Sequence, residues 1–206
     1  MSYVLVFDGD SIAFGQGATH GYTLADQTST LLSVKVIHHV TASGGRRISE
    51  CRDLFETNVK PLYQKKAARN VIFFCAGDND IAWDSSPQEA YSALETYVKC
   101  AQHEGWYVVV STKLQRYDWP EAGRAAMTEL NNLILNNRAG AEGVADFQND
   151  SIMGSEFGRL DQKYYTADHV HPANAGYTIL ARIAAAALLP ILLSADDINN
   201  SEARFI

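Results

Sequence analysis

The sequence predicts an α/β protein, a three-layer α/β/α sandwich with a central parallel sheet of five strands. Short valine-rich apolar segments alternate with longer segments of helical period, which is the pattern of repeated strand–helix units. Most of the apolar segments lack the alternation of a half-exposed strand, which indicates burial on both faces, as in a parallel sheet. Five such units in 206 residues suit a single domain, expected to span residues 1–206.

The strands and helices are expected in strict alternation along the chain. The apolar segments predict strands at residues 3–7, 34–40, 70–75, 106–111 and, more weakly, 143–147. Helical period predicts the helices that follow them, at about 22–33, 49–66, 87–104, 121–138 and 174–189. Pro87 and Pro120 lie near two helix starts, where a missing N–H costs little, and Gly105 ends the third helix. Residues 148–172 show no clear period, and loops of that length are usually functional.

Composition and charge indicate a folded protein that binds no nucleic acid and has no membrane span. With 47% hydrophobic and 20% charged residues, the chain can bury a full core. Its formal charge of -7 repels phosphate backbones, so no nucleic-acid partner is expected. The most apolar segment, 181–193, contains Arg182 and Pro190 and is too short to span a bilayer, which predicts a core-facing helix and no membrane span. No secretory signal precedes the first strand, which predicts a cytoplasmic protein unless a leader has been removed.

Small and polar residues follow the predicted strands, at the carboxyl ends where open parallel sheets bind ligands. These groups of residues are 9–11, 41–46 and 76–80, together with 168–172 before the last helix. The first group belongs to the segment "FDGDSI", which two unrelated chemistries share. In one, Asp8 is the nucleophile beside a magnesium ion. In the other, Ser11 is the nucleophile, and Asp8 and Asp10 are structural.

Under the aspartate interpretation, the chain resembles the haloacid-dehalogenase-like phosphatases. Its segment "VLVFDGDSI" fits the first motif of that family tolerably. That family next requires a strand-terminal serine or threonine, then a lysine, then an acidic pair for Mg²⁺. Here the acidic "GDND" precedes the strand-terminal "VVVSTK", so the order is wrong. The C-terminal "DHVH" is also left without a role, and the interpretation is therefore the less favoured one.

The serine interpretation accounts for more of the chain. A serine hydroxyl needs a neighbouring base, the base needs a group that holds its tautomer, and the oxyanion needs N–H donors. Asp168 and His171 are three residues apart, which allows a tight turn to bring the carboxylate to one imidazole nitrogen while the other faces the site. Gly44 and Gly45 allow the backbone to approach a substrate oxygen, and Asn79 can donate from its side-chain amide.

Four blocks of sequence occur in the order Ser, Gly, Asn, Asp-x-x-His. They are "GDSI" at 9–12, "ASGG" at 42–45, "GDND" at 77–80 and "DHVHP" at 168–172. With these blocks the chain resembles the SGNH (GDSL-type) hydrolases over nearly its whole length. The resemblance implies the flavodoxin-like fold of that family, with Ser11 as nucleophile, His171 as general base and Asp168 as the group that orients the histidine. It also implies an oxyanion hole formed by the backbone N–H groups of Ser11 and Gly44 and by the side chain of Asn79.

The implied activity is hydrolysis of a carboxylic ester or thioester without a metal or organic cofactor. The partner is then a small-molecule or carbohydrate ester, and both deacetylation of a carbohydrate and cleavage of a small acyl ester or thioester remain open. Gly45 is the alternative donor to Gly44, and His169 is the rival of His171. From a different class of protein, a catalytically silent binding module with the same fold is the alternative. The oligomeric state is not predicted.

Overall fold

Five parallel strands form a sheet at the centre of the computed structural model, which describes residues 2–193. The strands are β1 (Tyr3–Gly9), β2 (Val36–Val40), β3 (Arg69–Cys75), β4 (Tyr107–Ser111) and β5 (Gly143–Ala145). They pair in the order β2-β1-β3-β4-β5, and every pairing is parallel. This is the flavodoxin-like order, so the predicted fold class is confirmed. Residue 1 and residues 194–206 of the domain expected at 1–206 lie outside the described residues.

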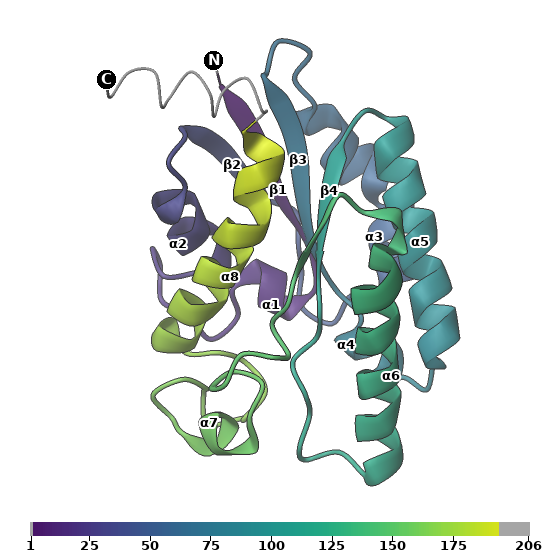
Figure 1. Cartoon of the computed structure of the whole chain (residues 1–206), viewed down its shortest axis with the longest axis vertical. Helices are drawn as coiled ribbons and strands as arrows, with labels where there is room; N and C mark the ends of the chain where they lie inside the picture. The colour runs from purple at the N-terminus through teal and green to yellow at the C-terminus, as the bar shows by residue number, and fades with distance from the viewer. Residues whose placement is uncertain (1, 194–206) are drawn as a thin grey trace.

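Helices cover both faces of the sheet and complete the three layers (Figure 1). Those of six residues or more are α2 (Leu24–Leu31), α3 (Ile48–Asp53), α5 (Pro87–His103), α6 (Glu121–Asn137) and α8 (Asn174–Leu192). The helices α2 and α8 lie on one face, and α3, α5 and α6 lie on the other. Alternate residues of β1 enter the two cores: Leu5 and Phe7 on the α8 side, Val4 and Val6 on the α5 side, all fully buried. Each such side chain stabilises the fold by about 1.5–3 kcal/mol.

Two of the predicted helices differ from those observed. The helix expected at 49–66 is α3, followed by a π-helical turn (Phe55–Val59) and a short 3-10 turn (Lys60–Leu62). Pro61 lies in the 3-10 turn and cannot donate the N–H that would continue an α-helix, so the helix ends early. The helix expected at 174–189 continues past Pro190 to Leu192 because Leu188 and Leu192 are fully buried in the core.

Three short helices were not predicted: α1 (Ser11–Phe14), α4 (Asp78–Ala82) and α7 (Glu156–Leu160). Helices of four or five residues are too short to show a helical period, so the sequence pattern cannot indicate them. The helix α1 follows β1, α4 follows β3, and α7 lies within the segment 148–172 that was expected to be irregular. All three lie near the end of the sheet where the strands reach their carboxyl ends (Figure 1).

The helix α8 is long and apolar enough, by length and composition alone, to cross a membrane. It has 19 residues, and an 18-residue window has a mean hydropathy of 1.7. The sequence analysis judged residues 181–193 alone to be too short to span a bilayer, whereas the helix that contains most of them begins at Asn174. Tyr177, Leu180, Ala184 and Leu188 on this helix are fully buried in the same core as β1 and β3. The packing is that of a core helix, as predicted from the apolar segment.

Candidate active site

A cavity of about 320 Å³ opens at the carboxyl ends of the strands. Five of the residues that the sequence singled out line it: Ser11, Gly44, Gly45, Asn79 and His171. They come from the loops after β1, β2 and β3 and from the segment before α8. This is the edge at which open parallel sheets bind ligands, because the strands deliver their following loops to the same place.

Ser11 begins helix α1 directly after the first strand. Gly9, with φ of 138°, turns the chain out of β1, where an added Cβ would lie only 1.9 Å from the carbonyl oxygen of Cys75. The same close approach lets the N–H of Asp10 donate to that carbonyl at 2.9 Å. The Asp10 carboxylate then caps α1 by accepting the N–H of Ile12 at 2.9 Å. Asp10 has the structural role expected of it, and it holds Ser11 at the cavity.

A chain of two hydrogen bonds connects Ser11 to Asp168 through the ring of His171. His171 Nε2 lies 3.0 Å from Ser11 Oγ, and His171 Nδ1 lies 2.7 Å from Asp168 Oδ2. Asp168 Oδ1 accepts the N–H groups of Val170 at 2.8 Å and of His171 at 3.0 Å, and the hydroxyl of Thr166 at 2.6 Å. Burial by itself raises the pKa of Asp168, but these hydrogen bonds outweigh it and hold the pKa well below its usual range. The carboxylate is therefore ionised at neutral pH, as the partner of an imidazole N–H must be.

The neighbouring His169 does not take part in this chain. Its φ is 56°, in the left-handed region, so its side chain leaves the backbone in a different direction from that of His171. Its Nδ1 lies 3.1 Å from the carbonyl oxygen of Arg159, and the residue does not line the cavity. Of the two histidines, it is His171 that reaches Ser11.

The residues expected in the oxyanion hole, Ser11, Gly44 and Asn79, line the same cavity, and Asn79 makes one contact that the sequence did not predict. Asn79 lies in the first turn of α4 and donates one amide N–H to the carbonyl oxygen of Arg46 at 3.0 Å, which leaves its second N–H for another acceptor. A Cβ on Gly44 would lie 3.9 Å from the Cβ of Ser11, so this residue passes beside the serine. Gly45 has a φ of 80° and nothing within 4 Å of an added Cβ. In the described part of the chain, the N–H of Gly44 has no protein acceptor.

Buried ionisable groups lie close to the loop that carries Ser11. Burial, together with the nearby Asp78 carboxylate, raises the pKa of Asp10 well above its usual range, and Asp10 Oδ2 has no hydrogen-bond partner. Burial likewise raises the pKa of Asp78, although the Lys113 ammonium opposes this shift. Lys113 is itself almost fully buried, and Cε of its side chain would lie 3.2 Å from a Cβ on Gly77. The Lys113 ammonium thus favours the charged forms of Asp10 and Asp78 and opposes the effect of their burial.

Asp8, the nucleophile of the alternative chemistry, lies away from the cavity. Its side chain is buried on the α5 side of the sheet, where Tyr97 donates a hydroxyl to Oδ2 at 2.5 Å. Thr41 donates a hydroxyl to Oδ1 at 2.9 Å. Both carboxylate oxygens are therefore occupied, and burial raises the pKa of the group. This environment suits a structural carboxyl and counts against a nucleophile.

The sequence interpretation missed the residues that form the far wall of the cavity. Gln115 and Arg116 follow β4, and Arg159 lies on α7. The position of Gln115 and Arg116 just beyond a strand end was the signal that could have identified them. Arg159 lies in the segment 148–172 that was expected to be functional, but nothing local in that segment singles it out. Among the described residues, no three His, Cys, Asp or Glu side chains gather in an arrangement that could hold a metal ion.

Comparison with known proteins matches this chain to one protein family and to several solved structures of similar fold. The model of the GDSL-like lipase/acylhydrolase family matches residues 7–179. Comparison with curated protein sequences yields no match. Among solved structures, a member of the lipolytic protein G-D-S-L family from Veillonella parvula has a TM-score of 0.73 at 19% identity, covering 89% of this chain and 96% of that one.

Two further solved structures are similar over most of their length. TesA has a TM-score of 0.70 at 18% identity, covering 94% of this chain and 100% of that one. A mutant of Axe2, an acetyl-xylooligosaccharide esterase from a Geobacillus species, has a TM-score of 0.67 at 16% identity, covering 87% of this chain and 91% of that one. At these identities the structures show a shared fold alone.

Proposed function

The chain belongs to the GDSL-like lipase/acylhydrolase family, and from this premise we propose that it is a serine hydrolase that cleaves a carboxylic ester. In the proposal Ser11 is the nucleophile, His171 the general base and Asp168 the group that holds the tautomer of the histidine. One observation carries it: His171 Nε2 lies 3.0 Å from Ser11 Oγ while its Nδ1 lies 2.7 Å from Asp168 Oδ2. These distances are those of a nucleophile, a base and an orienting carboxylate in hydrogen-bond contact.

The proposed reaction has two halves. Ser11 Oγ attacks the ester carbonyl carbon as its proton passes to His171 Nε2, and the carbonyl oxygen becomes an oxyanion. The C–O bond to the alcohol breaks as the oxyanion collapses, and His171 returns the proton to the departing alkoxide. Water then attacks the acyl-serine through the same base, which releases the carboxylic acid and restores the serine hydroxyl. Asp168 stays ionised throughout and stabilises the imidazolium that forms in each half.

The oxyanion needs hydrogen-bond donors that are in place before the reaction. We assign this role to the N–H of Ser11, the N–H of Gly44 and the side-chain amide of Asn79. The position of Gly44 beside the Cβ of Ser11 supports it over Gly45 as the backbone donor. The bond from Asn79 to the Arg46 carbonyl supports its assignment as well, because it holds the amide in one orientation.

The substrate options are an acetyl ester of a carbohydrate and a small acyl ester or thioester. A cavity of about 320 Å³ suits a small acyl group. The similar fold of an acetyl-xylooligosaccharide esterase is in keeping with the first option. A catalytically silent binding module is the alternative, but it has no use for the complete hydrogen-bonded chain from Ser11 to Asp168.

The test is labelling with an organophosphonate, followed by turnover of an ester panel. We expect one adduct, mapped by mass spectrometry to Ser11, and hydrolysis that is lost in Ser11→Ala and in His171→Ala but kept in His169→Ala. His169 is the matched control because it is the adjacent histidine outside the hydrogen-bonded chain. Turnover of a phosphate monoester that EDTA abolishes and Mg²⁺ restores would favour Asp8 instead. Glycan binding without hydrolysis of any ester would favour the silent module.

A further inference from the structure

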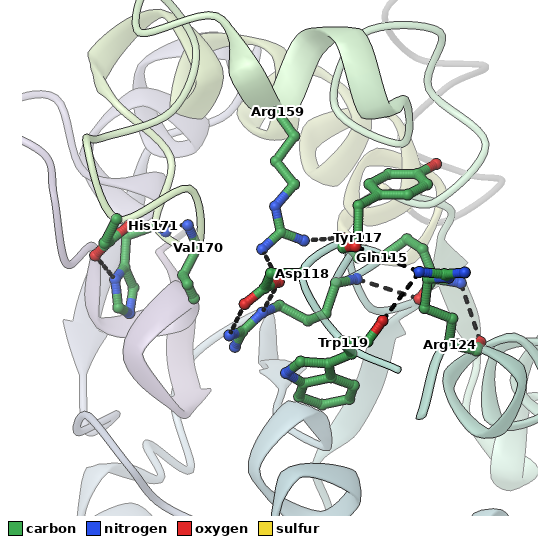
Figure 2. Close-up of polar contacts among 10 residues, drawn as sticks. Gln115, Tyr117, Asp118, Trp119, Arg124, Arg159, Val170 and His171 are labelled. Carbon is green, nitrogen blue, oxygen red and sulfur yellow. Dashed lines mark hydrogen bonds and ion pairs between the residues drawn. The ribbon is translucent and has the colours of Figure 1, made fainter. Parts of the chain in front are cut away.

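A cluster of three charged residues lies at the wall of the cavity, outside the groups assigned to catalysis. Arg116, after β4, and Arg159, on α7, line the cavity together with Ser11 and His171. Asp118 pairs with both arginines. Arg116 donates from Nη2 to Asp118 Oδ2 at 2.9 Å and from Nε to Oδ1 at 3.2 Å, and Arg159 donates from Nη2 to Oδ1. Figure 2 shows Arg159 extending from its helix toward Asp118.

The surrounding contacts hold both guanidinium groups in place. Arg159 has a side chain only 3% exposed and donates from Nη1 to the carbonyl oxygen of Gln115 at 2.7 Å. Arg116 lies over the ring of Trp119, with 4.9 Å from its guanidinium carbon to the ring centroid. The hydrogen bond from Arg116 lowers the pKa of Asp118 to about 2, so the carboxylate is ionised at neutral pH. The cluster is therefore two fixed cations around one anion.

Within the cluster, two cations pair with one anion, and several N–H donors of the arginines remain at the cavity. Each guanidinium has five N–H groups, and the bonds to Asp118 and Gln115 use two on each arginine. The others have no acceptor among the residues that the structure describes. Arg116 is 20% exposed, so a ligand in the cavity can reach it. Asp78 also lines the cavity, and both the buried Lys113 and Arg116 lie close enough to its carboxyl to favour its charged form. A positive site in a chain with a formal charge of -7 is a local feature and not a general property of the surface.

We propose that Arg116 and Arg159 bind a carboxylate on the substrate, so that the preferred ester carries an acidic group on its acyl or alcohol part. The inference rests on the proposed ester hydrolysis and names the substrate class of the same site. A guanidinium presents paired N–H groups that match a planar carboxylate. The cluster has one more cation than anion, which balances a monoanion, whereas a phosphate dianion would leave one negative charge unpaired.

The test compares two esters of similar length, 4-nitrophenyl hemisuccinate with a free carboxylate and the neutral 4-nitrophenyl pentanoate. The measured quantity is the preference, defined as kcat/KM for the acidic ester divided by kcat/KM for the neutral one. We expect Arg116→Gln to lower this preference by about tenfold or more, the usual effect of losing a hydrogen bond to a charged group. Arg116 is chosen because the more deeply buried Arg159 is needed for packing.

The matched control is Arg124→Gln. Arg124 donates from Nη1 to the carbonyl oxygens of Tyr117, at 3.4 Å, and Trp119, at 3.0 Å, so it supports the same loop without lining the cavity (Figure 2). We expect its preference to match wild type. An unchanged preference in Arg116→Gln, or an equal loss in Arg124→Gln, overturns the proposal. A 3-phosphonopropanoate ester that is preferred over the hemisuccinate overturns the assignment of a carboxylate.

A binding measurement separates this inference from the proposed reaction. Calorimetry on Ser11→Ala compares N-(4-nitrophenyl)succinamic acid with the neutral N-(4-nitrophenyl)pentanamide, with and without Arg116→Gln. Tighter binding of the acid that depends on Arg116 supports the carboxylate site even where the wild-type protein hydrolyses no ester. Equal binding of the two amides overturns the inference, and ester hydrolysis by the wild type would then leave the proposed function intact.

Discussion

Replacing Asp168 with asparagine tests whether this carboxylate holds the tautomer of His171. Asp168 Oδ1 accepts hydrogen bonds from Val170, His171 and Thr166, and an asparagine oxygen can accept all of them, so the turn should fold as before. The amide nitrogen then replaces Oδ2, 2.7 Å from His171 Nδ1. Because this nitrogen only donates, Nδ1 must accept and the ring proton moves to Nε2. A protonated Nε2 faces Ser11 and cannot take its proton.

The expected loss of turnover is large because the substitution removes the base in its working form. In a serine protease, replacing the buried aspartate of the triad with asparagine lowers kcat by about 10⁴-fold, because the histidine is then held in the wrong tautomer. Here the Asp168 side chain is 49% exposed, so water can compete for Nδ1 and soften the effect. We therefore expect a loss of about 10²–10⁴-fold, or roughly 2.7–5.4 kcal/mol of transition-state stabilisation.

The assay is kcat on 4-nitrophenyl acetate near neutral pH, with thermal unfolding measured on the same preparations. Asp168→Ala is the comparison, because it removes the turn's hydrogen bonds as well and should also lower Tm. Asp168→Asn should keep the wild-type Tm within a few degrees while losing activity. A variant with wild-type Tm that retained more than about a tenth of kcat would refute the reasoning, since an imidazole in the wrong tautomer cannot act as the base.

Three further substitutions test other parts of the structure. Asn79→Ala should lower kcat about 10²–10³-fold in steady-state assays with less effect on KM, and a loss below about threefold would contradict its role as an oxyanion donor. Asp10→Asn can still accept the N–H of Ile12. Because burial raises the pKa of Asp10, this group costs the wild type stability as pH rises above the usual carboxyl range, and the variant lacks that contribution. The Tm gain of Asp10→Asn should therefore grow between about pH 4 and 8 in thermal unfolding, and parallel pH profiles would contradict this. Gly9→Ala places a Cβ 1.9 Å from the Cys75 carbonyl oxygen at φ of 138°, so denaturant unfolding should show a loss of roughly 3 kcal/mol or more, and a loss under about 1 kcal/mol would contradict the close approach.

The sequence was sufficient for the fold class and for the placement of the main site residues at one edge. Continuous apolar strands alternating with periodic helices indicate a parallel sheet, and a parallel sheet carries every strand's following loop to the same end. Ser11, Gly44 and Asn79 follow three different strands, so their meeting at one cavity is a consequence of topology. This is why a single sequence could place them together before any contact was known.

The sequence pattern could not predict the direction in which individual side chains of the site point. The helices α1, α4 and α7 have four or five residues and show no period, yet they carry Ser11, Asn79 and Arg159 respectively. Whether His169 or His171 reaches the serine depends on the left-handed backbone at His169, which sequence spacing does not encode. The inward direction of Asp8 likewise follows from the pleat of β1 against α5 and not from its motif.

What the sequence determined by itself was the periodic part of the molecule: which segments are strands, that they are parallel, and which of their ends hold polar residues. Only the tertiary structure decided which side chains meet across the cavity. Arg116 and Arg159 belong to segments with no shared period or motif, and Asp118 pairs them only because the chain after β5 folds back over the end of β4. Periodicity reports burial that repeats along one segment, whereas a pairing between two irregular segments depends on turns and packing far apart in the chain.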